Sequence, residues 1–160
     1  MTGKYSDTVP DMYNGLKLTG SFDLIAQFPN GRVEHRFGKN LVTSVGESLV
    51  AKLIDINGAE TAPNYIAFGS GSNNALKSDT QLQSEIASTR ELVDSTLQVA
   101  NTLALTWNIT VGSTYTIREM GIFNDAAAGT IFSRFLTQQL TVASGVVFDI
   151  VWTLTISGVD

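Results

Sequence analysis

The sequence predicts a mainly β fold, a β-sandwich or jelly-roll-like arrangement of antiparallel sheets with one or two short helices packed on the sheet. Large apolar residues occupy every second position in segments 102–110 and 146–156, and two further alternating segments flank a turn near the N-terminal end. Side chains along a strand point alternately to opposite faces, so this alternation is typical of strands with one buried face. A clear helical repeat of apolar residues occurs in only one segment, 45–56.

Residues 17–37 are predicted to form a hairpin. Apolar side chains recur on one face of segment 18–28, and Pro29-Asn30-Gly31 supplies the fixed φ of proline and the permissive glycine of a tight turn. Segment 32–37 is predicted to be the second strand of the hairpin. His35, the only histidine, is interpreted as a strand-face residue because no second ligand-type residue accompanies it.

The helix predicted over 45–56 is expected to cover a sheet. Val45, Leu49 and Leu53 recur every fourth residue, which places them on one helix face. Ser44 and Glu47 have the spacing of a capping box, and Asn57-Gly58 provides a stop signal.

A short apolar strand, 65–68, leads into the glycine loop Gly69-Ser70-Gly71. A strand followed by such a loop is the context of a phosphate cradle, but Asn74 stands where the dinucleotide fingerprint needs its third glycine, and no Gly-Lys-Ser/Thr ending follows. The loop is therefore interpreted as a structural turn over the end of a sheet. A second short helix is expected over 78–89, where Leu82 and Ile86 lie one turn apart.

The remainder is predicted to be β. The apolar stripe of 146–156 is long enough to predict a strand at the centre of the sheet or paired across an interface. Trp107 and Trp152 lie on apolar stripes and are expected in the core, whereas Asp149 alternates onto the opposite face. In segment 114–123, Arg118 and Glu119 are expected to project from opposite faces and therefore to have different partners.

Length and composition indicate one β-rich domain, 17–160, preceded by an extended arm, 1–16. The chain has 160 residues, of which 43% are apolar, and a formal net charge of −5, which disfavours binding to nucleic acid. It contains no cysteine and no run of about 18 apolar residues, so no membrane span is expected. The arm carries Tyr5 and Tyr13; it either packs loosely on its own domain or reaches a neighbouring subunit.

An enzyme is not expected, and neither is a cofactor or a metal. The candidate carboxylates Glu34, Glu85, Glu119 and Asp149 share no short motif, and no cysteine or second histidine could complete a nucleophile–base pair. Metal-ligand spacings of the His-x-x-x-His or Cys-x-x-Cys kind are also missing from the sequence.

Five short motifs follow one another along segment 33–157. They are Asn40-Leu41-Val42 with Gly46 and the helix 49–54, Ile66 to Gly71, Leu82-x-x-Glu85-Ile86 with Arg90, Ile117 to Phe123, and Ile131-Phe132-Ser133-Arg134. In this order and spacing they resemble a family of tailed-bacteriophage virion proteins that includes minor structural, tail-collar-fibre-like and capsid-associated members. The arm is not covered by the resemblance.

The resemblance implies a non-enzymatic virion protein, assembled in the host cytoplasm and located on the outer capsid surface or the tail. Its expected partners are the major capsid protein or tail proteins, and further copies in a homo-oligomer. Collar fibres usually continue into a long shaft, whereas this chain ends soon after Ser157, which favours a subunit that decorates and cements the capsid. The alternatives are a tail collar, baseplate or fibre-attachment protein and, more distantly, a carbohydrate-binding module with an exposed tryptophan.

The positions that match the family motifs are expected to be architectural. Gly69 and Gly71 would form the turn, Gly121 would allow close packing, and Glu85 would pair with Arg90 or Arg118. Glu119 and Arg134 complete the set of expected structural or interaction residues, together with Tyr5 and Tyr13 of the arm.

Overall fold

A computed structural model describes residues 15–158, which form nine strands and one helix. The strands are β1 (Leu16–Gln27), β2 (Val33–Val42), β3 (Tyr65–Gly69), β4 (Glu91–Leu92), β5 (Ser95–Val99), β6 (Thr102–Thr110), β7 (Tyr115–Phe123), β8 (Ile131–Val142) and β9 (Val147–Gly158), and the helix is α1 (Ser44–Ile54). The predicted mainly β fold is confirmed.

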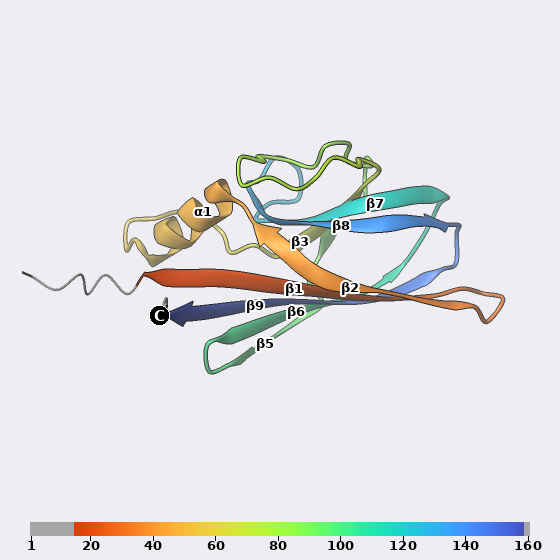
Figure 1. The fold of residues 1–160 in the computed structure, drawn as a ribbon, viewed down its shortest axis with the longest axis horizontal. Coiled ribbons are helices and arrows are strands. Elements are labelled where there is room, and N and C mark those ends of the chain that lie inside the picture. Colours follow the sequence, from red (N-terminus) through yellow and green to blue (C-terminus); the bar gives the residue numbers. More distant parts are fainter. Residues whose placement is uncertain (1–14, 159–160) are drawn as a thin grey trace, which may run out of the picture.

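The strands form one antiparallel sheet in the order β4-β3-β7-β8-β2-β1-β9-β6-β5, which curls into a half-barrel. Figure 1 shows β7 and β8 above β1, β9 and β6. The sheet turns from one layer to the other at β2, which pairs with β1 along most of its length and reaches β8 only at Leu41 and Val42. Apolar side chains from both layers meet in one main core, where Phe22 stacks on Phe135 at 4.5 Å between ring centroids.

The predicted hairpin and the predicted central strand are confirmed. The amide of Phe28 donates to the carbonyl of Arg32 (2.8 Å), and Gly31 adopts a φ of +84° that favours glycine. β9 pairs with β1 on one edge and with β6 on the other. Trp107 and Trp152 are buried, as expected for residues on the inward stripes of β6 and β9.

Helix α1 begins and ends differently from the prediction. Thr43, not Ser44, is the N-cap residue: its Oγ1 accepts the amide of Gly46 (3.0 Å) and donates to the carbonyl of Ile131 (2.8 Å). The bond to Ile131 favours Thr43 over Ser44 as the N-cap residue, because it also links the start of the helix to β8. The helix ends at Ile54, and Ile56 beyond it is 92% exposed. Within residues 15–158, no helix is long and apolar enough to cross a membrane.

The helix predicted over 78–89 is wrong. This segment is an irregular part of the loop between β3 and β4, which covers the outer side of β7 and β8 (Figure 1). Its backbone groups bond to distant partners instead of to one another: the amide of Ile86 donates to the carbonyl of Phe68, and the carbonyl of Ser84 accepts from Ser70 (2.9 Å each). Leu82 packs in a second apolar cluster with Ala67, Phe123 and Ile131.

Candidate functional site

The buried charges of the described residues meet at one place, between the outer side of β7–β8 and the loop of residues 70–90. Glu119 projects from β7 and Arg134 from β8, and their side chains are 0% and 2% exposed. Arg134 Nη2 lies 2.7 Å and Nε 2.8 Å from Glu119 Oε2. Arg118 bonds instead to Gln139, so the prediction that Arg118 and Glu119 have different partners is confirmed, although a bulge in β7 between Ile117 and Glu119 interrupts the regular alternation.

The Glu119 carboxylate also holds the covering loop. Its Oε1 accepts the amides of Gly71 (3.0 Å) and Ser84 (2.7 Å), and its Oε2 accepts the amide of Gln83 (3.1 Å). Because a buried carboxylate is costly unless its lone pairs are bonded, these amides and Arg134 together make the burial of Glu119 possible. The same bonds fasten both ends of the loop segment 71–84 to β7.

Arg134 extends the cluster to two further residues, which the sequence did not identify. Its Nη1 donates to Asp79 Oδ2 (2.7 Å), and its Nη2 donates to the carbonyl of Asn73 (3.1 Å). Asp79 appeared to belong to a helix start, and no local signal links it to a residue 55 positions away. The sequence offered only Arg134 itself, a charged residue among apolar residues of β8, and nothing in the sequence identified its partner as Asp79.

The three predicted architectural glycines all lie at this cluster. A Cβ at Gly69 would stand 2.6 Å from the Glu119 side chain, and one at Gly71 would stand 2.4 Å from Glu119 Oε1. A Cβ at Gly121 would stand 3.0 Å from Leu82. Side chains at the first two positions would displace the carboxylate, so these glycines are required by close approach.

Glu85 and Arg90 form the second predicted pair, and Arg90 rather than Arg118 is the partner. Arg90 Nε and Nη2 bond to the two carboxylate oxygens of Glu85 (2.7 and 3.0 Å). The guanidinium lies 3.9 Å from the centre of the Phe123 ring, and its Nη1 donates to the carbonyl of Asp125 (2.9 Å). Arg90 thus ties the end of the loop to the turn after β7.

Asp125 lies in that turn, and the folded protein stabilises the charged form of its carboxylate. Its Oδ1 accepts the amides of Ala127 (2.8 Å) and Ala128 (3.3 Å). These two bonds, and then the charge of Arg90, lower the pKa of Asp125 below its ordinary value, while burial opposes them.

We expect Asp125→Asn to reduce stability at neutral pH and to have little effect in acid. The pKa of Asp125 is lower in the folded protein than in the unfolded chain, so the charged form of Asp125 stabilises the fold. This stabilisation is fully present at pH values above the pKa of the unfolded chain, and it is lost as the pH falls through the pKa of the folded protein. Urea unfolding of the wild type and the variant at pH 7 and in acid measures the difference. An equal difference at both pH values would show that the charge of Asp125 is not involved.

The ionic cluster is a closed network, suited to holding a loop rather than to chemistry. Both oxygens of Glu119 are occupied, and each nitrogen of the Arg134 side chain has an acceptor. No group of three or more possible metal ligands occurs within the described part of the chain. Tyr5 and Tyr13 lie outside the described residues.

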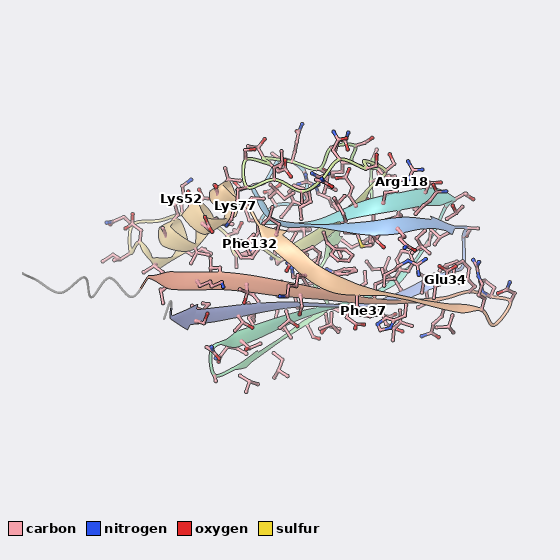
Figure 2. The ribbon with its side chains drawn as sticks, in the orientation of Figure 1. Glu34, Phe37, Lys52, Lys77, Arg118 and Phe132 are labelled. Carbon is pink, nitrogen blue, oxygen red and sulfur yellow. The ribbon has the colours of Figure 1, made fainter. Side chains whose placement is uncertain are left out.

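The other candidate is the outer face of the sheet, defined here as the solvent-facing sides of β2, β1, β9, β6 and β5. Phe37 projects from β2 on this face, away from β7 and β8, and is 71% exposed (Figure 2). The face also carries five other exposed apolar side chains: Ile25, Val33, Leu97, Val99 and Val151. Polar residues separate them; Asp23, for example, contacts His35 at 3.0 Å.

Comparison with protein-family models, curated proteins and solved structures found no match for this chain. The outer face and the closed ionic cluster are therefore the features from which a function has to be inferred.

Proposed function

We propose that this protein is a non-enzymatic bacteriophage virion protein that decorates the assembled capsid and stabilises the shell. The observation that carries the proposal is the outer face. In its central row, Phe37 lies opposite Asp23 on β1, and Asp23 lies opposite Val151 on β9. Exposed apolar side chains set among polar neighbours on one face have the mixed composition of a surface that contacts another protein.

Burial of these apolar side chains against a partner protein would be energetically favourable. Burying one large apolar side chain contributes about 1.5–3 kcal/mol, so a few of the six exposed on this face could offset part of the entropy lost on association. Stabilisation of the shell then follows from mass action, because a subunit that binds the assembled lattice better than free shell subunits shifts the equilibrium toward the lattice. The partner would be the major capsid protein, and neighbouring copies would form a homo-oligomer on its surface.

Two internal features support a structural rather than a sugar-binding role. The polar groups of Glu119 and Arg134 are bonded to each other and to the loop, so they are not available to bind an external ligand. Trp107 and Trp152 are buried in the core, so neither provides the exposed aromatic platform on which a sugar ring stacks.

The test is to mix the purified protein with capsids that lack it and with isolated tails, and to locate it by electron microscopy. We expect density at regular positions over the shell, and a higher temperature of capsid disruption when the protein is bound. Density only at the neck or the tail would make the protein a collar, baseplate or fibre-attachment component instead. Binding to neither would contradict a virion role.

A pair of matched variants tests the face itself. Phe37→Asp should weaken capsid attachment by about 10-fold or more, because it places a charge where an apolar side chain would be buried. Ile56→Asp makes the same kind of change at a more exposed position beyond α1 and should leave attachment unchanged. Equal attachment of the two variants would exclude the outer face as the contact surface.

A further inference from the structure

The strand at one end of the sheet, β5, has an unpaired edge among residues 15–158. β5 is the last strand in the sheet order and pairs only with β6. All of its residues are exposed, and Figure 1 shows it at the lower margin of the molecule, away from β7 and β8. Its free side therefore presents backbone N–H and C=O groups that another strand can bond.

The opposite end of the sheet is protected, whereas β5 is not. β4 has only two residues, and the carbonyl of Glu91 in it accepts the indole N–H of Trp107 (3.1 Å). Short strands, charged side chains and prolines are common protections of a sheet edge. β5 has five residues, with no charged side chain and no proline among them. It therefore has the properties of an edge that accepts a further strand.

The turn after β5 determines which backbone groups face the free edge. A two-residue turn joins Val99 to its partner Thr102, and Ala100 in this turn has a φ of +51°. The residues that flank such a turn exchange hydrogen bonds, and alternate residues along the strand then bond toward opposite sides. The odd-numbered residues of β5 therefore bond to β6, and the backbone groups of Thr96 and Gln98 face the free edge.

We propose that β5 of a second copy of this chain pairs with this edge, antiparallel and around a two-fold axis at Leu97. In this register Thr96 of each copy lies opposite Gln98 of the other copy in a hydrogen-bonded pair. The N–H and C=O groups of both residues then all have partners. The contact is self-complementary, as a two-fold dimer interface requires.

Contacts at the two ends of β5 favour this register over its neighbours. The amide of Asp94 is directed to β6, where it donates to the carbonyl of Thr106 (3.0 Å), and the carbonyl of Ala100 accepts the side chain of Gln98. If the second strand shifted along the edge to the next register in either direction, Asp94 would lie opposite Gln98 or Ala100 opposite Thr96. One of the required hydrogen-bonding groups would then already be in use.

The side chains agree with the same register. Leu97 lies opposite its own copy in a non-hydrogen-bonded pair, where cross-strand side chains are closest, and Val99 lies opposite Ser95. No charges meet across the axis, because β5 has none. Leu97 and Val99 belong to the outer face, and the axis is perpendicular to the joined sheet. The outer faces of the two copies therefore point to the same side.

The dimer goes beyond the proposed virion role and does not depend on it, so it is tested in solution without capsids. Pairing of two five-residue strands buries less than the roughly 1,600 Å² of a standard stable interface, and we therefore expect dimerisation to depend on protein concentration. If the outer face also binds a shell, two joined faces would bind it more tightly than one.

Single cysteines test the dimer in the full chain, which has no cysteine of its own. In Leu97→Cys the two thiols would face each other across the axis, with Cα atoms about 4.5 Å apart, within disulfide range. Val99→Cys is the matched control. Val99 is apolar, lies on the same face and is similarly exposed, 61% against 64% for Leu97. Its Cα atoms in the two copies would be about 14 Å apart, too far for a disulfide.

In a glutathione buffer at equal protein concentration, we expect the yield of disulfide-linked dimer to be about 10-fold or more higher for Leu97→Cys than for Val99→Cys. The difference should vanish in urea, where no strand pairing remains. Equal yields in native buffer would refute the proposed dimer.

A proline at the free edge provides a second test. Thr96→Pro, added to Leu97→Cys, removes an N–H that bonds only across the axis, so the pairing of β5 with β6 loses no hydrogen bond. We expect the yield of linked dimer to fall to that of Val99→Cys, with circular dichroism showing that the domain remains folded. An undiminished yield would refute pairing through this edge.

Discussion

Replacing Arg134 with alanine is expected to lower the free energy of unfolding by about 3–5 kcal/mol. The substitution leaves the fully buried carboxylate of Glu119 without its cation, and it removes the donors to Asp79 and to the carbonyl of Asn73. The loop over β7–β8 should loosen as well, because the bonds of Asp79 and Asn73 to Arg134 hold that side of it. Urea unfolding measures the loss, and hydrogen exchange of the Gln83 and Ser84 amides locates it.

Arg118→Ala is the matched control, since Arg118 lies on the neighbouring strand and its side chain bonds only to Gln139 among the described residues. We expect it to change stability by less than about 1 kcal/mol. The double variant Glu119→Gln with Arg134→Met should recover part of the loss, because a neutral amide oxygen can still accept loop amides without a buried charge. Similar losses for Arg134→Ala and Arg118→Ala would contradict the assignment of the cluster as the fastening of the loop.

Gly46→Ala is expected to destabilise the protein by about 2–3 kcal/mol, although helix propensity alone predicts a gain of about 1 kcal/mol. Gly46 lies in the first turn of α1, where a Cβ would stand 2.1 Å from the carbonyl oxygen of Phe132 on β8. Phe132 lies beside α1 (Figure 2), and its carbonyl already accepts the amide of Thr43. Backbone cannot yield as a flexible side chain does, so the helix has to move away from the sheet.

The control is Gly112→Ala, because a Cβ at Gly112 meets no atom within 4 Å and its φ is not in the left-handed region. Its stability should be unchanged or raised by up to about 1 kcal/mol. Thermal or urea unfolding of both variants gives the comparison. A gain in stability for Gly46→Ala would mean that α1 is not pressed against β8.

The sequence by itself determined the strands that carry a clear apolar stripe and the first hairpin. Period-two alternation makes each of β6 and β9 a strand with one buried face, whatever its neighbours are, and this placed Trp107 and Trp152 in the core. Pro29-Asn30-Gly31 specified a turn by local backbone preference alone. The sequence also indicated different partners for Arg118 and Glu119, although β7 bulges between Ile117 and Glu119 and the alternation is interrupted there.

Only the tertiary structure decided which polar groups meet. Segment 78–89 has helical spacing, but the Glu119 carboxylate, 35 residues beyond Ser84, takes amides that a helix would have used. Thr43 displaced Ser44 as the cap because Thr43 alone also bonds to β8. Asp79 likewise bonds to Arg134, a residue that only the fold brings close to it. Apolar periodicity depends only on residues that are close in the sequence. The partner of a buried charge depends on which residues the fold brings next to that charge. A buried charge without a partner costs more free energy than local helix propensity can supply, so the pairing overrides the propensity.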